Sequence, residues 1–149
     1  MQITSNSVLF EEMFGNGEVA FSVVSNRTGD RKTFQVTRAK DRDNGGLGWF
    51  VSQLTGPDNR LSYTYLLMLT VRGKGDVPTM RLTAKSPTSG FEHEGVKAFR
   101  WLFNNAIEET NTLHQAAVWR ACNCRRCGKL LTVPESIEAG IGPVCGNRE

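Results

Sequence analysis

The spacing of the cysteines constrains this chain more than any other feature of its sequence. All four lie in the last quarter, in the order Cys122-x-Cys124-x2-Cys127-x17-Cys145. Two thiolates separated by two residues can bind one tetrahedral ion when the chain between them turns tightly and its backbone N–H groups point back at the sulfurs. The pattern therefore predicts a structural zinc (Zn2+) site that gives the C-terminal segment its shape.

Glycines stand where such a site needs turns. Gly128, directly after Cys127, can take the positive φ that ends a tight turn. A short helix is predicted between the two halves of the site, with Thr132 as its N-cap and Gly140 as its stop. This helix would close the loop that brings Cys145 to the other ligands.

The sequence leaves the fourth ligand open between two residues. Cys122 is favoured because closed structural zinc sites prefer sulfur, and His114 is the alternative. A redox dithiol is disfavoured, because no buried strand and following helix surround Cys124. A disulfide framework is also disfavoured, since we expect no secretory leader and a chain of this length needs no covalent staples.

The same residues carry a resemblance. The run from Cys124 to Cys145, CRRCGKLLTVPESIEAGIGPVC, resembles an uncharacterised family of short zinc-knuckle domains that recurs at the C-termini of phage and actinobacterial proteins. A tract upstream, Trp49 to Leu66, resembles a segment that precedes this domain in many of them. Members often carry a histidine about four residues before the first cysteine of the pair, where this chain has Arg120. The family brings no established activity, so the resemblance implies a zinc knuckle and no reaction.

Alternating apolar residues upstream of the cysteines predict an antiparallel sheet of about five strands. The predicted strands span 18–25, 32–39, 47–54, 63–71 and 79–85. Charged or glycine-rich loops are expected at 40–46 and 72–76. In the fourth strand, strict alternation would place Tyr63, Tyr65 and Leu67 on one face.

The apolar period changes to that of a helix after this sheet. Val96, Phe99 and Phe103 form one stripe, and Ser89 with Glu92 fits a capping box, so a helix is predicted from about Glu92 to Glu109. A last strand at 115–119 would lead to the metal site. The prediction is an α+β fold, with a domain at 1–114 and a zinc-knuckle module at 115–149.

Composition bears on function less strongly. The net charge of +3 and the pI near 8.8 give mild support to a nucleic-acid partner. We expect a cytoplasmic protein without a membrane partner, because no apolar run is long enough to span a bilayer. Nucleotide-binding loops and nucleophile elbows are absent from the sequence, and the cysteines are committed to the ion, so we expect a non-enzymatic protein.

Basic residues supply the candidate partner contacts. Arg125, Arg126 and Lys129 belong to the metal turn, whereas Arg81 and Lys85 are predicted to face outward from a strand. The leading hypothesis is an accessory protein, phage-encoded by its resemblance, that binds nucleic acid or a nucleic-acid-processing complex. The alternatives are an inhibitor that docks on a host defence or transcription complex, and an enzyme of unrecognised class.

Aromatic residues are a second set of candidates, since exposed rings can stack on bases. The candidates are Trp49, Tyr63, Tyr65 and Trp119. Because these residues occur in the most apolar segments, the sequence favours burial in the core over exposure.

Overall fold

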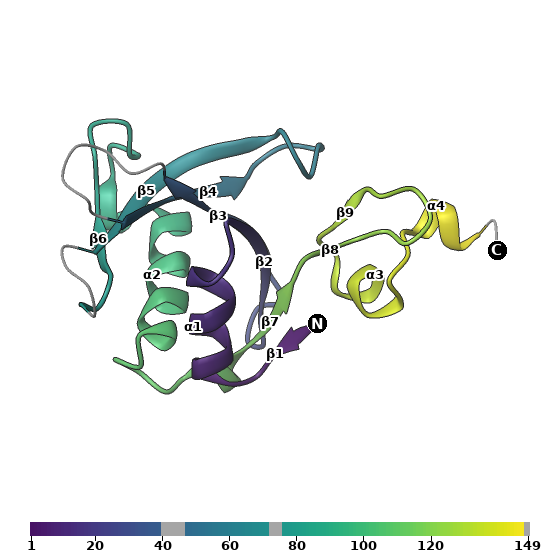
Figure 1. Ribbon diagram of the computed structural model, residues 1–149, viewed down its shortest axis with the longest axis horizontal. Helices are drawn as coiled ribbons and strands as arrows, with labels where there is room; N and C mark the ends of the chain where they lie inside the picture. The colour runs from purple at the N-terminus through teal and green to yellow at the C-terminus, as the bar shows by residue number, and fades with distance from the viewer. Residues whose placement is uncertain (40–46, 72–75, 148–149) are drawn as a thin grey trace.

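The computed structural model describes residues 1–39, 47–71 and 76–147. Over these residues, an antiparallel sheet is covered on one face by two helices and continues into a small C-terminal knuckle (Figure 1). The predicted α+β architecture is confirmed. The loop predicted at 40–46 and most of that at 72–76 lie outside the described residues.

The main sheet has seven strands in the described part of the chain, each antiparallel to its neighbours, in the order β1-β7-β2-β3-β4-β5-β6. The strands are β1 (Gln2–Ile3), β2 (Glu18–Ser25), β3 (Arg31–Ala39), β4 (Leu47–Leu54), β5 (Tyr63–Val71), β6 (Thr79–Arg81) and β7 (Ala116–Arg120). The sequence missed β1 because a pair of residues carries no readable period. Strand β7, which leads to the cysteines, belongs to this sheet and lies between β1 and β2.

Helices α1 (Asn6–Phe14) and α2 (Glu94–Ala106) pack on one face of the sheet, here called the inner face (Figure 1). No sequence signal predicted α1. Its buried residues are Leu9 and Met13, a stripe too short to establish a helical period, and the residue before it, Ser5, makes no capping hydrogen bond. In the described part of the chain, no helix has the length and apolar character needed to cross a membrane.

Helix α2 begins and ends inside its predicted limits. A 3-10 turn (Gly90–Glu92) precedes it, and His93 is its N-cap, accepting hydrogen bonds at Nδ1 from Gly95 N at 3.1 Å and Val96 N at 3.4 Å. The predicted capping role of Ser89 is therefore wrong. After Ala106 the chain turns away, with Glu108 at a φ of 64°.

The core lies between the inner face and these helices. The rings of Phe34 on β3 and Phe99 on α2 meet at 5.5 Å with a 65° angle between their planes. Trp49 on β4 is 4% exposed and packs edge-on against Phe14. Burial of these aromatic rings fixes the helices against the sheet.

A β-bulge changes which residues of β5 face the core. Val51 pairs with Leu67, whereas Ser52 pairs with Tyr65, so Leu66 is the extra residue and is buried beside Leu67. Strict alternation had placed Tyr65 and Leu67 on one face. The bulge instead puts Tyr65 on the outer face of the sheet, the face opposite α1 and α2.

Candidate metal centre

The chain leaves the sheet at Arg120 and forms the knuckle, residues 122–147. Its elements are a hairpin of β8 (Cys122–Asn123) and β9 (Leu130–Leu131), followed by α3 (Pro134–Ala139) and α4 (Pro143–Gly146). Gly128 takes a φ of 77° at the end of the first turn, and Gly140 takes 72° after α3, as predicted. The short helix has Val133 rather than Thr132 as its N-cap, because Thr132 is buried against the sheet.

Backbone hydrogen bonds close the knuckle around its centre. Cys124 N donates to Lys129 O at 2.7 Å, and Gly128 N donates to Cys124 O at 2.9 Å, which makes the first turn tight. Arg125 N donates to Gly140 O at 3.0 Å and so joins the turn to the second half of the knuckle. Cysteines that are far apart in sequence thereby come together.

The sulfur atoms of Cys124, Cys127 and Cys145 all lie within 4.8 Å of one another. Two thiolates on a tetrahedral zinc ion, with Zn–S bonds of about 2.3 Å, lie about 3.8 Å apart. Only small side-chain adjustments would therefore let all three bind one ion. Cys124 is buried and Cys127 is exposed, so the cluster lies at the surface of the knuckle.

The backbone around Cys124 favours its thiolate. N–H groups of Cys127, Gly142 and Arg126 lower the pKa of the Cys124 thiol to about 6. These amides come from both halves of the knuckle, as expected for a turn that stabilises a metal-bound sulfur. The pKa of Cys145 is raised, first by its hydrogen bond with the Cys127 side chain and then by burial.

Neither candidate for the fourth ligand lies in this cluster. Cys122 is partly buried and packs against the knuckle core, where its Sγ faces Ile137 O at 3.9 Å. His114 lies in a 3-10 turn (Leu113–Gln115) before β7, and that strand separates it from the knuckle by about 16 Å. In the described residues, three of the four predicted ligands converge, and Cys122 is apart from them because β8 pairs it with Leu131 on the hairpin.

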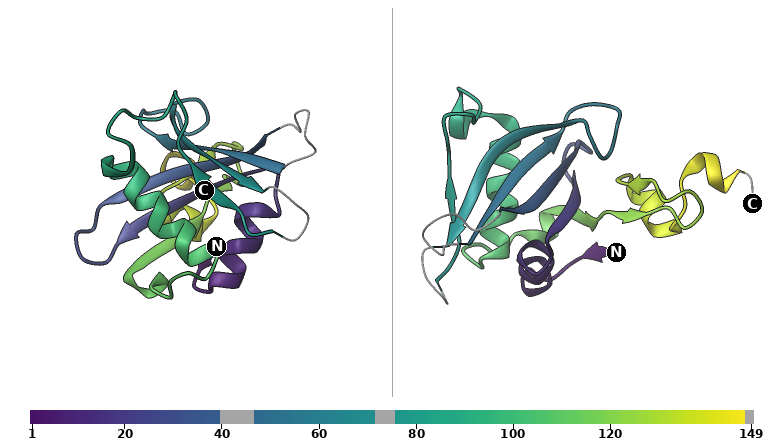
Figure 2. Two further views of the ribbon diagram at one scale, coloured as in Figure 1. Left: turned by 90° about the vertical axis from the view of Figure 1, so that its left-hand side faces the viewer. Right: turned by 45° about the horizontal axis from the view of Figure 1, so that its top comes forward.

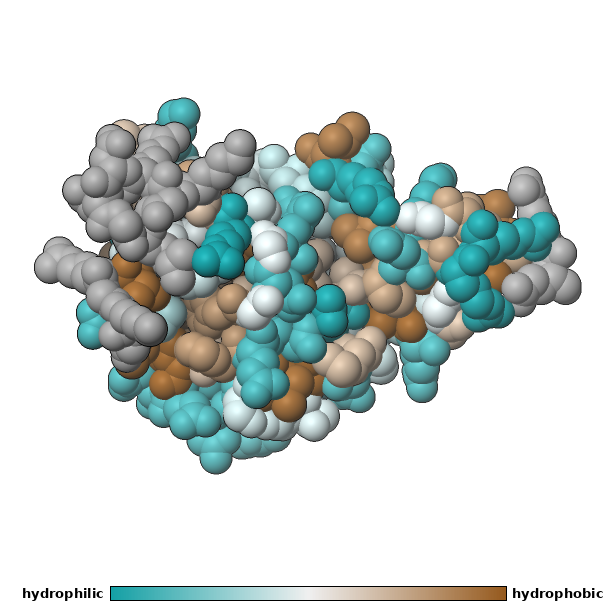
Figure 3. Space-filling view, viewed as in Figure 1, coloured by the Kyte–Doolittle hydropathy of each residue, from teal (hydrophilic) through white to brown (hydrophobic). Residues whose placement is uncertain are grey.

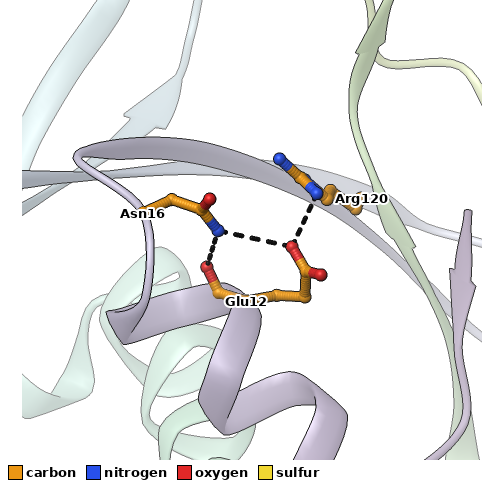
Figure 4. A network of polar contacts seen from close by, with 3 residues as sticks. All are labelled: Glu12, Asn16 and Arg120. Carbon is orange, nitrogen blue, oxygen red and sulfur yellow. Dashed lines mark hydrogen bonds and ion pairs between the residues drawn. The ribbon is translucent and has the colours of Figure 1, made fainter.

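Arg120, which stands where the resembling family often has histidine, also points away from the cysteines. Its Nη1 donates to Glu12 Oε2 on α1 at 2.7 Å, and Asn16 Nδ2 donates to Glu12 O at 2.9 Å (Figure 4). This network joins the end of β7 to α1 just before the knuckle begins. Arg120 therefore anchors the exit from the sheet.

The basic residues of the metal turn hold the knuckle together. Arg125 Nη1 donates to Ala139 O, at the end of α3, at 2.7 Å, and Arg126 Nη1 donates to Cys145 O at 3.3 Å. Lys129 is exposed. Hydrophilic residues gather at the end of the knuckle away from the sheet (Figure 3).

Arg81 and Lys85 belong to a different region of the surface. Both are exposed, and they lie on and just after β6, the edge strand at the far side of the sheet from β7 (Figure 1). The structure therefore does not gather the five predicted contact residues into one patch.

Polar contacts dock the knuckle on the sheet. Asn59 Nδ2 donates to Leu130 O at 2.8 Å, and Arg60 Nη2 donates to Gly128 O at 2.9 Å. Both come from the loop between β4 and β5, where Arg60 N and Leu61 N bond to Asp58 and lower its pKa. On the outer face of β2, Ser22 Oγ donates to Thr132 O. The knuckle thus has its own small core but sits on the sheet.

The aromatic candidates divide between the core and the outer face. Trp49 is in the main core, and Trp119 packs against the knuckle core. Burial raises the pKa of Tyr63 to about 12, with Glu18 and Asp58 adding to the effect. Tyr65 is half-buried on the outer face beside Phe50, which the sequence did not single out. The bulge in β5 brings Tyr65 to the face that Phe50 already occupies, and no sequence signal predicted the bulge.

A family model matches the chain over the knuckle and its approach. Residues 119–149 match a family of unknown function, DUF6011. This agrees with the resemblance seen in the cysteine motif, and the match does not reach the tract from Trp49 to Leu66. No curated protein matches the chain, and no solved structure does.

Proton release should report the lowered pKa of Cys124. A thiol with a pKa of about 6 is already mostly ionised at about pH 7, so zinc displaces almost no proton from it there. At about pH 5.5 the same thiol is mostly protonated, and zinc binding should release about two thirds of a proton more per ion. Calorimetry in buffers of different ionisation enthalpy measures this difference. Equal proton release at both pH values would contradict a pre-ionised Cys124.

Proposed function

We propose that this protein is a small zinc-binding protein in which Cys124, Cys127 and Cys145 hold one structural ion. The observation that carries the proposal is the convergence of three sulfurs within 4.8 Å from positions up to 21 residues apart. Thiolates are soft ligands that favour zinc over hard ions such as magnesium or calcium. The remaining coordination position belongs to a ligand outside this cluster.

The size of the knuckle core supports a structural role for the ion. In the described residues this core has four buried side chains, Cys124, Leu131, Ile137 and Ile141, separate from the main core. So few apolar contacts cannot offset the conformational entropy of ordering such a segment, and small modules of this kind need a metal or another cross-link. Zinc would supply that cross-link.

We further propose that the protein has a non-enzymatic role and that its partner is nucleic acid. The net charge of +3 and the exposed cations Lys129, Arg81 and Lys85 support this proposal. Arg125 and Arg126 have a structural task in the knuckle, so their reversal would test folding as much as binding. Lys129 belongs to the same turn, but its side chain is exposed, which makes it a cleaner test position.

Charge reversal at exposed lysines tests the nucleic-acid proposal. The zinc-loaded protein should bind a labelled oligonucleotide with an affinity that falls about 20- to 40-fold between about 50 and 200 mM salt, as expected for about three phosphate contacts. Lys129→Glu should weaken binding several-fold. Lys97→Glu, an equal change of charge on α2, is the matched control and should not. Fluorescence anisotropy measures both, and salt-independent or absent binding would contradict the proposal.

One observation favours a second candidate, the docking of a protein. The loop between β4 and β5 exposes Leu61 (82%), and the knuckle exposes Val144 (64%). A phage-encoded inhibitor of a host defence or transcription complex would use such residues, and the phage setting rests on the resemblance of the knuckle motif. Pull-down from a nuclease-treated bacterial lysate distinguishes this candidate, since a protein partner stays bound after nucleic acid is removed.

A further inference from the structure

Within residues 1–39, 47–71 and 76–147, no helix or strand covers the outer face of the sheet over β3, β4 and β5. Helices α1 and α2 cover the inner face, and in the tilted view these strands lie in front of α2, with no helix or strand of the described part of the chain over them (Figure 2, right). The pairing register places Phe50 opposite Met68, and Ser52 opposite Tyr65, on this outer face. The bulge in β5 is therefore the local feature that brings a tyrosine to an uncovered surface.

The exposed Phe50 and the half-buried Tyr65 form an aromatic pair on the outer face. Their ring centroids are 6.1 Å apart with an interplanar angle of 65°, and Phe50 is 39% exposed. The Oη of Tyr65 lies 3.0 Å from Thr83 Oγ1, a hydrogen bond that fixes the direction of the ring. Because the Tyr65 ring is already fixed, the pair loses little conformational entropy when a flat ligand stacks on it.

Hydrogen-bonding and cationic groups surround the pair. Gln35 on β3 is opposite Ser52, and it also lines a groove of about 550 Å³ between the sheet and the knuckle, together with Arg60 and Asn123. On the other side, Arg81 of β6 is opposite Met68 and is exposed. The acidic side chain that lines the groove, Glu18, is hydrogen-bonded to Gln35. Cations thus lie at both ends of a path that crosses the aromatic pair.

We propose that this outer face binds a single-stranded nucleic acid, with an unpaired base stacked on Phe50 and the backbone running between the groove and Arg81. The proposal rests on the nucleic-acid binding proposed above and names its surface and strand type. Only unpaired bases offer a free face to an aromatic ring, so the pair selects single strands over duplexes. Amide and hydroxyl groups such as Gln35 and Ser52 are suited to the edges of splayed bases.

Substitutions at Phe50 in the full-length, zinc-loaded chain test this surface. Fluorescence anisotropy compares a labelled single-stranded oligonucleotide, as DNA and as RNA, with the corresponding duplex. Phe50→Ala should weaken single-strand binding about tenfold, the usual effect of losing one stacked base. Phe50→Leu keeps an apolar side chain but not the ring and should lose nearly as much, whereas Phe50→Trp should keep the affinity.

Phe91→Ala is the matched control, since Phe91 is 45% exposed and lies before α2 with Arg100 above its ring. Urea denaturation of each variant verifies that it is folded.

Three outcomes would contradict this surface. If single strands bind but Phe50→Ala binds them as tightly as Phe91→Ala does, the outer face is excluded as the binding surface, while the proposal of nucleic-acid binding stands. If Phe50→Leu binds as wild type, or duplex binds as tightly as single strand, stacking is excluded. If no nucleic acid binds, both proposals fail, and loss of a lysate protein with Phe50→Ala would assign the face to protein docking.

Discussion

Cys124→Ser is expected to abolish stable zinc binding and to unfold the knuckle while the main sheet stays folded. Structural zinc in finger peptides contributes about 10–16 kcal/mol, so one thiolate accounts for roughly 3 kcal/mol, a loss of affinity of 100-fold or more. Cys124 is also the buried member of the cluster, on which three backbone N–H groups converge. Competition with a chromophoric chelator measures the affinity, and amide exchange reports the folding of residues 122–147.

Cys122→Ser is the matched control for this experiment. It makes the same chemical change two residues away, at a thiol that contacts Ile137 O instead of the other sulfurs. We expect its zinc affinity to stay within a few-fold of wild type, with a small loss of knuckle stability from the packing contact. If Cys122→Ser lost zinc as completely as Cys124→Ser, Cys122 would be the fourth ligand and the cluster of three would be incomplete.

Removing zinc with a chelator should unfold the knuckle and leave the main sheet folded. The knuckle core has few buried side chains, whereas the main core contains Phe21, Phe34, Phe99 and many aliphatic residues between sheet and helices. We therefore expect amides of β8, β9 and α3 to lose nearly all protection from exchange. Amides of β3 and β4 should keep theirs, because their ladder does not involve the knuckle.

Hydrogen–deuterium exchange with peptide-level resolution tests this expectation on one sample before and after chelation. Re-addition of zinc should restore protection in the knuckle, which separates metal loss from irreversible damage. Unchanged protection at β8 and β9 after complete chelation would show that packing alone holds the knuckle. Collapse of protection in β3 and β4 would show that the ion stabilises the whole chain.

Most strands of the sheet could be predicted from the sequence because they are long and half-buried. The alternation of Val19, Phe21 and Val23 predicted β2, and the stripe of Val96, Phe99 and Phe103 predicted α2. Helix α1 and strand β1 could not be predicted from the sequence, because both are short. They depend on contacts with α2 and β7 that the sequence does not reveal. The capping role of His93 was missed because Ser89 offered a commoner signal.

The metal cluster was predictable in part. Spacing and glycines identified Cys124, Cys127 and Cys145, which the structure brings together. The place of Cys122 depended on how β8 pairs with β9, and the roles of Arg125 and Arg126 depended on which carbonyls lie within their reach. The exposed pair of Phe50 and Tyr65 depended on a bulge. Such details are set by tertiary contacts, for which linear spacing carries little information.

Native mass spectrometry of the freshly purified protein tests the central claim most directly. The claim is that the three clustered thiols hold one zinc ion, so the intact folded chain should carry the mass of a single zinc and lose it on acidification. Cys124→Ser, prepared alongside, should carry none. A wild-type protein that is folded, fully reduced and metal-free after purification with added zinc would contradict the account.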